Sequence, residues 1–292
     1  MIIRPENWVF LGDSLTEGLG SSRISYVTEL AWRIREAGSA SKSELAVHEI
    51  RLRKVDPDDF NRFIRFNLAG YLNEDGQDSQ QTIWLWNLAC AGRTIESDFE
   101  WLPLLHNLRP ERVVVFRGSL ESIIRPAMLR DDSWPWWVPT GWRGYAAMDP
   151  RCYFSTTWWR KSKQVVIDAL KQKVRLYLLQ RLPGEPLMDL NTLMTHYTML
   201  LTHLQELDAR ILVLGLLPVD DKCFPGSPYY FKCVNEQLHK MADNVGVEFF
   251  DWGESLKMEG HPAELFYRDG FHPNLAGAHA LTNILRKHLL SN

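Results

Sequence analysis

The sequence predicts an α/β protein, built as a three-layer α/β/α sandwich around a five-stranded parallel sheet. Its 292 residues, 45% of them hydrophobic and 24% charged, suffice for one large α/β domain. Five short apolar runs have the length and composition of buried strands. Amphipathic helical patterns separate these runs, and such alternation indicates right-handed βαβ units with helices on both faces of the sheet.

The first predicted strand is Trp8–Asp13, an apolar run that ends at a glycine and an aspartate. The first helix is predicted over Ser25–Ala37, where apolar residues recur at helical spacing. The four other strands are predicted, in chain order, at Thr82–Asn87, Arg112–Gly118, Ile211–Pro218 and Val247–Trp252. The later helices are predicted at about 96–108, 161–180, 189–207, 230–244 and 276–289.

Two stretches interrupt this alternation and are predicted to be insertions. Residues 41–81 are polar and mixed, with a helix predicted near Asp59–Leu72. Residues 125–161 are rich in Trp, Pro and Gly and are expected to form an irregular loop. Neither contains a linker that requires a domain boundary, so we predict a single domain over residues 1–292.

Composition excludes several classes of protein. The net charge of -3 and the pI near 6.3 carry no signature of a nucleic-acid or membrane partner. No apolar run approaches the roughly 18–20 residues that span a bilayer, and the N-terminus does not have the pattern of a signal peptide. The four cysteines form no Cys-x-x-Cys pair, which favours a reduced, cytoplasmic protein without a zinc site. Neither a P-loop nor a Gly-x-Gly-x-x-Gly motif is present, so no cofactor or metal is expected, and the oligomeric state stays open.

The first chemical signal is Gly12-Asp13-Ser14-Leu15, directly after the first predicted strand. A serine at a strand-to-helix turn presents its hydroxyl at the carboxyl edge of the sheet, where backbone N–H groups face any developing negative charge. Ser14 is therefore a candidate nucleophile. The alternative is an ordinary helix cap, because Asp and Ser are both good N-cap residues.

The second signal, Asp269-Gly-Phe-His272-Pro273, comes just before the last predicted helix. An aspartate three residues before a histidine in a tight turn can hold one imidazole nitrogen, which leaves the other free to accept a proton from a serine hydroxyl. An acidic turn before a helix is the alternative. The order of the two signals in the chain favours a shared site.

Together these motifs resemble those of the GDSL, or SGNH, hydrolase superfamily. Gly12–Leu15 and Asp269–Pro273 are similar to its first and last blocks. Asn87–Thr94, which follows the second predicted strand, is similar to the second block. Residues 101–110 and Val113–Gly118 are similar to the approach to the third block, so the resemblance covers nearly the whole chain.

The resemblance implies a flavodoxin-like SGNH hydrolase fold and a serine esterase with a catalytic triad. In that interpretation Ser14 is the nucleophile, His272 the general base and acid, and Asp269 the residue that orients the imidazole. The backbone N–H groups of Ser14 and Gly92 would form the oxyanion hole.

One position departs from the family pattern. Leu120 stands where the third block has an asparagine that donates to the oxyanion, and leucine cannot donate a hydrogen bond. The loss of one such donor typically costs about 2.7–4 kcal/mol of transition-state stabilisation. Ser119 is the nearest candidate replacement, with an ordinary turn hydroxyl as the alternative. The segment Gly118–Pro126 also resembles a divergent branch of the superfamily, found in polysaccharide or specialised-metabolite settings.

The aromatic insertion permits two interpretations. Six of the 12 tryptophans lie between Trp134 and Trp159, and Trp136, Trp137 and Trp142 are candidate walls of an acyl or sugar pocket. Alternatively, the insertion uses its tryptophans for a small core of its own. The cationic residues of 160–175 are expected to form a solvated helix face, with an acidic acyl carrier or a phosphorylated substrate as the alternative.

The expected function is therefore serine-dependent hydrolysis, through an acyl-enzyme, of a small-molecule or carbohydrate ester. One alternative is an acyltransferase that uses the same three residues in polysaccharide or specialised-metabolite biosynthesis. The other is a binding protein that keeps the hydrolase scaffold but has lost catalysis, for which the leucine at position 120 would be the reason.

Overall fold

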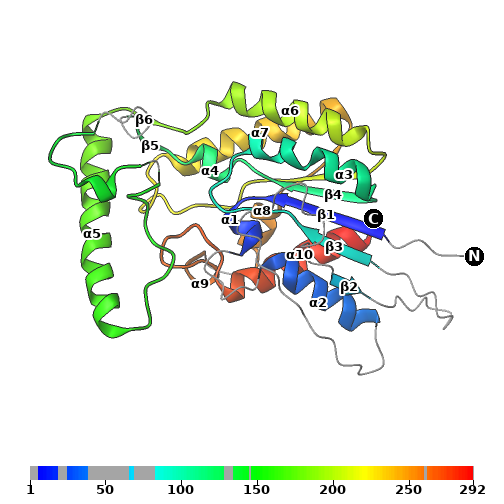
Figure 1. Cartoon of the computed structure of the whole chain (residues 1–292), viewed down its shortest axis with the longest axis horizontal. Coiled ribbons are helices and arrows are strands. Elements are labelled where there is room, and N and C mark those ends of the chain that lie inside the picture. The colour runs from blue at the N-terminus through cyan, green and yellow to red at the C-terminus, as the bar shows by residue number, and fades with distance from the viewer. Residues whose placement is uncertain are drawn as a thin grey trace, which may run out of the picture.

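The centre of the molecule is a six-stranded sheet with the order β2-β3-β1-β4-β7-β8 (Figure 1). The structure, a computed structural model, describes residues 6–18, 25–38, 66–68, 83–127, 134–144, 146–259 and 262–291. Five strands run parallel: β1 (Glu6–Gly12), β3 (Ile83–Asn87), β4 (Arg112–Phe116), β7 (Arg210–Leu214) and β8 (Glu248–Phe250). The five-stranded parallel sheet predicted from the sequence is confirmed.

The sixth strand was not predicted. β2 (Phe66–Leu68) pairs antiparallel with β3 at the edge of the sheet. The helix predicted near Asp59–Leu72 is therefore wrong over these three residues, whose backbone bonds to a neighbouring strand instead of to its own helical turn. The rest of the predicted 41–81 insertion lies outside the described residues.

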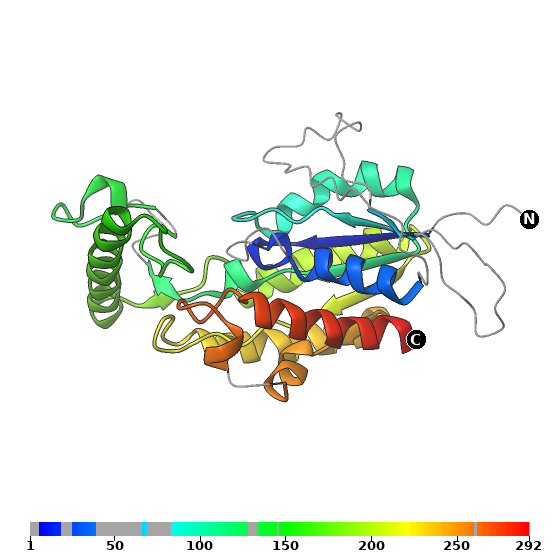
Figure 2. The ribbon, with the colours of Figure 1, turned by 90° about the horizontal axis from the view of Figure 1, so that it is seen from below.

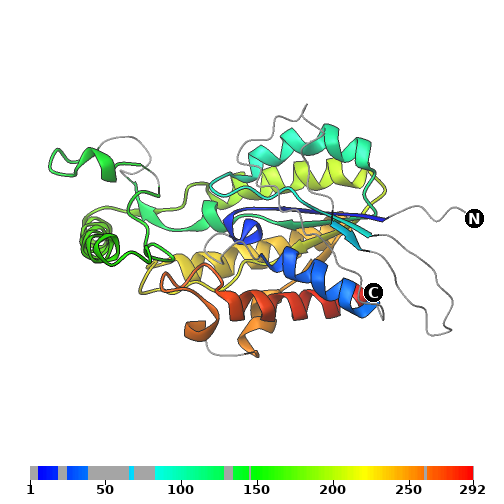
Figure 3. The same cartoon turned by 60° about the horizontal axis from the view of Figure 1, so that its bottom comes forward.

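Helices cover both faces of the sheet (Figure 3). On one face α2 (Tyr26–Gly38) packs against α10 (Leu275–Ser291), which also contacts α8 (Trp252–Lys257). On the other face α6 (Leu190–Gln205) packs between α7 (Ser227–Val245) and η2 (Ile95–Trp101), which continues into α3 (Leu102–Leu108). The other predicted helices are confirmed with ends shifted by a few residues, although the one predicted at 96–108 begins as the 3-10 helix η2.

Short elements gather where the parallel strands end. They are α1 (Ser14–Glu17), α4 (Ser119–Ser122) and α9 (Pro262–Leu265). Because all five parallel strands point the same way, the loops that follow β1, β3 and β4 meet at this carboxyl edge. The sheet thereby brings together segments that are up to about 105 residues apart in sequence.

The 125–161 insertion leads into a long helix that stands apart from the sandwich. β5 (Arg125–Pro126) pairs with β6 (Gly184–Glu185), η4 (Thr140–Trp142) forms a single turn, and α5 (Trp158–Arg181) follows. Figures 1 and 2 show α5 beyond the carboxyl edge of the sheet. The small core beside it comprises Trp134, Val138, Met148 and Leu178. The single domain with two insertions stays a prediction.

Candidate active site

Ser14 is the first residue of α1, directly after β1 ends at Gly12. Asp13 caps this helix, because its Oδ1 accepts a hydrogen bond from the Leu15 N–H at 2.9 Å. A side chain at position 12 would collide with Thr16, whose Oγ1 lies 2.1 Å from the site of a Cβ atom. Glycine at this position therefore permits the tight turn that presents the serine.

The turn that carries His272 holds the Asp269 carboxylate with its own backbone. Asp269 Oδ1 accepts hydrogen bonds from the N–H groups of Phe271 and His272, both at 3.1 Å. Its other oxygen, Oδ2, lies 2.7 Å from His272 Nδ1. The three-residue spacing thus directs one carboxylate oxygen at the imidazole, and the buried Phe271 anchors the turn to the core.

The structure brings the two sequence signals together. Ser14 Oγ lies 3.1 Å from His272 Nε2, within hydrogen-bond reach of a general base. A continuous Ser14–His272–Asp269 chain results, with the aspartate 1% exposed and the serine and histidine half-buried. The chain has the geometry in which an imidazole takes a proton from a hydroxyl while a carboxylate holds its other nitrogen.

The loop that follows β3 lies beside Ser14. The Cys90 N–H donates to the Gly12 carbonyl at 3.1 Å, and the Ala91 N–H donates to Glu17 Oε2 at 2.6 Å. These two bonds hold Gly92, whose positive φ of 76° suits glycine. Neither the Gly92 N–H nor the Ser14 N–H donates to a described residue, so both can serve as donors to a ligand.

The sequence pattern of the GDSL-like Lipase/Acylhydrolase family matches residues 10–280. The chain belongs to that family. This match confirms the superfamily predicted from the sequence motifs. Membership of the family supports the expectation that the protein is a hydrolase.

Solved structures with the same fold share little sequence with this family member. An acetylxylan esterase from Geobacillus stearothermophilus, Axe2, is 13% identical with a TM-score of 0.52, over 99% of this chain and 96% of its own. TesA is 15% identical with a TM-score of 0.54, over 97% and 98%. A putative GDSL-like lipase from Parabacteroides merdae is 12% identical with a TM-score of 0.50, over 99% and 98%. No curated protein matches significantly in sequence. These likenesses confirm the SGNH hydrolase fold.

A buried ionic cluster lies beneath the site of this GDSL-like hydrolase, and the sequence did not predict it. Arg117, which follows β4, pairs with Asp98 through two hydrogen bonds, of which Nε to Oδ2 measures 2.7 Å. Its Nη1 donates to the Arg93 carbonyl at 3.0 Å, next to Gly92. Asp98 and Arg117 are fully buried, and Asp98 raises the pKa of the guanidinium. The cluster therefore positions the Gly92 loop.

Glu121 joins the same cluster from α4. Its Oε1 accepts a hydrogen bond from the Ile95 N–H at 2.7 Å, while burial raises the pKa of its carboxyl to about 7. Burial also raises the pKa of Asp13. Burial outweighs the charge of Arg117, which lowers the pKa of all three buried carboxyl groups, so Glu121 stays protonated in mildly acidic solution.

We expect the Glu121→Gln variant to lose part of the pH dependence of stability. The folded protein keeps the Glu121 proton up to about pH 7, whereas the unfolded chain releases it near the ordinary value of 4.5. Wild-type stability should therefore fall as the pH rises between these values, by up to about 3 kcal/mol from this group. Urea unfolding of both proteins at pH 5 and pH 8 measures the difference. An equal change in the two proteins would contradict the assignment.

The structure contradicts Ser119 as the replacement oxyanion donor. Its side chain is fully buried in α4, and its hydroxyl lies against the Asp13 carboxyl, where it helps to lower the pKa of that group. A substrate cannot reach a donor in that position. Leu120, at the position of the family's asparagine, is half-buried, and its carbonyl accepts from Arg125 Nη1 at 3.2 Å.

The three candidate pocket tryptophans have different surroundings in the structure. Trp136 is 89% exposed, and the Trp137 ring meets Tyr177 of α5 edge-on at 6.4 Å. Trp142 packs on the small core beside α5, with the Lys171 ammonium 5.9 Å from its ring centre. The alternative interpretation, a small core for the insertion, is confirmed for Trp142.

Cys152 lies beside Asp269 and His272 and was not singled out from the sequence. The Cys152 thiol, the Asp269 carboxylate and the His272 imidazole have ligand atoms that all lie within 4.8 Å of one another. Among the described residues, these three form a group that could hold a metal ion. Burial, followed by the charge of Asp269, raises the pKa of this thiol to about 11. Cys152 is therefore a neutral thiol at physiological pH and a poor nucleophile.

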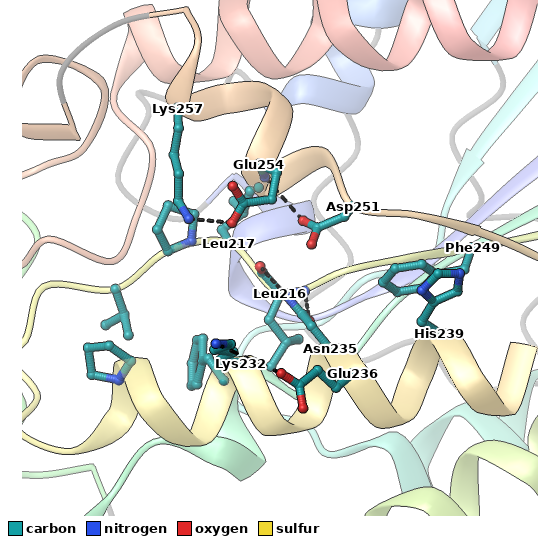
Figure 4. Close-up of a pocket in the computed structure, with 15 residues that line it drawn as sticks. Leu216, Leu217, Lys232, Asn235, Glu236, His239, Phe249, Asp251, Glu254 and Lys257 are labelled. Atoms are coloured by element: carbon teal, nitrogen blue, oxygen red, sulfur yellow. Dashed lines mark hydrogen bonds and ion pairs between the residues drawn. The ribbon is translucent and has the colours of Figure 1, made fainter.

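A cleft of 680 Å³ lies away from this chemistry, between α7, α8 and the ends of β7 and β8 (Figure 4). Ser14, Asp269 and His272 do not line it. Its polar side chains pair with one another: Asn235 bonds both backbone groups of Leu216, and Lys257 pairs with Glu254. The cleft therefore presents no convergent set of free polar groups to a ligand.

Proposed function

We propose that this GDSL-like family member is a serine-dependent carboxylic-ester hydrolase that works through an acyl-enzyme. The observation that carries the proposal is the chain of contacts from Ser14 Oγ through His272 to Asp269, at 3.1 and 2.7 Å. Ser14 and Asp269, the two ends of this chain of contacts, are 255 residues apart in sequence. A helix cap and an acidic turn with unrelated roles would have no reason to lie together.

In the first half-reaction Ser14 Oγ bonds to the ester carbonyl carbon as its proton passes to His272 Nε2. The tetrahedral oxyanion accepts hydrogen bonds from the N–H groups of Ser14 and Gly92. His272 returns the proton to the leaving alkoxide, the ester C–O bond breaks, and the acyl group stays on Ser14. Water then attacks with His272 as base, which releases the acid and restores the serine. Asp269 stabilises the imidazolium in both half-reactions.

The substrate is expected to be a small-molecule or carbohydrate ester. Ser14 and His272 are half-buried, and Leu120 stands at the position of the family's asparagine. With two backbone donors and no asparagine, we expect activated or good-leaving-group esters to react fastest, because they need the least stabilisation of the oxyanion.

Labelling with a fluorophosphonate tests the proposal. We expect intact-mass analysis to show one adduct on the wild-type protein and none on the Ser14→Ala variant, because only a serine activated by a base attacks the phosphorus. The Ser162→Ala variant, which removes an exposed serine of α5, is the matched control and should be labelled like the wild type. An adduct that persists in Ser14→Ala, or a folded wild-type protein without an adduct, would refute the mechanism.

A further inference from the structure

The outward face of α5 carries a stripe of exposed apolar side chains. Trp159, Val166, Leu170 and Tyr177 are 76%, 67%, 49% and 49% exposed. Their spacing of seven, four and seven residues places them within about 40° of one direction around the helix, at roughly 100° per residue. We call these four residues the α5 stripe.

The opposite face of α5 accounts for how the helix is held. Asp168, Lys171, Arg175 and Leu178 are its buried residues. Lys171 Nζ donates to the Ala147 carbonyl at 2.7 Å, and Leu178 belongs to the small core of the insertion. The helix thus has a packed face of its own, and the α5 stripe is not part of the core.

Cations surround the stripe without acidic partners. The exposed basic residues of the helix are Arg160, Lys161, Lys163, Lys173 and Arg181. None of these five forms an ion pair with another described residue. The one acidic residue of α5, Asp168, is buried and pairs with Arg268 at 2.6 Å. At roughly 100° per residue, Lys163, Lys173 and Arg181 lie within about 40° of the stripe's direction. The outward face is therefore both apolar and positive, although the whole chain has a net charge of -3.

We propose that the α5 stripe docks on the surface of an anionic phospholipid bilayer. An interfacial helix of this kind inserts Trp, Tyr and Leu at the level of the headgroups while its Lys and Arg side chains attract the lipid phosphates. The 24 residues of α5 form a convex rod about 36 Å long, which suits a broad surface better than a pocket on a protein. A second copy of the same helix would bring these cations together, and their repulsion opposes self-association.

The position of α5 links such docking to the active site. Figures 1 and 2 show the helix beyond the carboxyl edge of the sheet, where Ser14 begins α1. Asp168 of α5 pairs with Arg268, the residue before Asp269 of the triad. The docked helix would therefore hold the catalytic edge close to the bilayer. This proposal departs from the expectation of no membrane partner, which rested on net charge and therefore missed the local segregation of charge.

Sedimentation with vesicles tests the proposal. We expect the full-length protein to bind vesicles of 70% phosphatidylcholine and 30% phosphatidylserine at least about tenfold more strongly than vesicles of phosphatidylcholine alone, at 0.1 M salt. The Trp159→Glu/Leu170→Glu variant should lose that binding by about tenfold or more. Its fluorophosphonate labelling should stay at the wild-type level, which separates docking from the proposed hydrolysis.

The matched control is the Met199→Glu/Tyr229→Glu variant, which places two glutamates at comparably exposed apolar positions on α6 and α7. This control should bind anionic vesicles like the wild type. Absence of wild-type binding to anionic vesicles, or equal losses in the two variants, would overturn the proposal. A wild-type dimer in light scattering that the α5 variant abolishes would assign the stripe to a second copy instead, and retention by an acidic protein without vesicle binding would assign it to that partner.

Discussion

The Ser14→Ala variant is expected to lower kcat for a small activated ester such as p-nitrophenyl acetate by roughly 10⁵–10⁶-fold. The hydroxyl that lies 3.1 Å from His272 Nε2 is the atom that forms the acyl-enzyme, and no other described serine has that contact. Circular dichroism and urea unfolding should show an intact fold, because the half-buried hydroxyl contacts only His272 among the described side chains. Residual activity above about one per cent in a purified variant would contradict the mechanism.

The chain offers a matched control for the histidine of the same site. His279 also has its Nδ1 2.7 Å from a carboxylate oxygen, that of Glu29, but Ser14 is not its partner. We expect His272→Ala to lose turnover as severely as Ser14→Ala and His279→Ala to keep it. Equal losses in the two histidine variants would indicate a structural effect and count against a proton-transfer role for His272.

The Arg117→Met variant is expected to destabilise the fold by about 3–5 kcal/mol, because it leaves the buried Asp98 carboxylate without its partner. The charge of Arg117 also lowers the pKa of the buried Asp13 and Glu121, so its loss removes the favourable field from three acidic groups. Urea unfolding at pH 7 measures the change in the free energy of unfolding.

The Asp98→Leu/Arg117→Met double variant provides the control. Replacement of both members of a buried pair by apolar residues of similar size removes the unpaired charge, so we expect it to recover part of the lost stability. Arg117→Met should also lower the rate of fluorophosphonate labelling, since the guanidinium no longer holds the Arg93 carbonyl beside Gly92. A single variant as stable as the wild type would show that the cluster does not support the site.

The predictions that held are those that rest on local patterns. The apolar runs identified all five parallel strands, because a strand buried on both faces needs an uninterrupted apolar sequence whatever its neighbours are. The same applies to Asp269 and His272, whose spacing of three residues places one carboxylate oxygen on the turn and the other on the imidazole. Both patterns depend on residues close together in the chain, so a single sequence contains them.

Contacts between segments that are distant in the chain could not be predicted from local sequence patterns. Ser119 and Ser14 are both serines at strand-to-helix turns, yet one hydroxyl is buried against Asp13 and the other faces His272. The outward direction of the α5 stripe was equally hidden, because a helical pattern does not reveal which of its faces packs against the protein. Local spacing determines the strands, the turns and the contact of Asp269 with His272, whereas burial and charge at each position depend on which segments fold against one another.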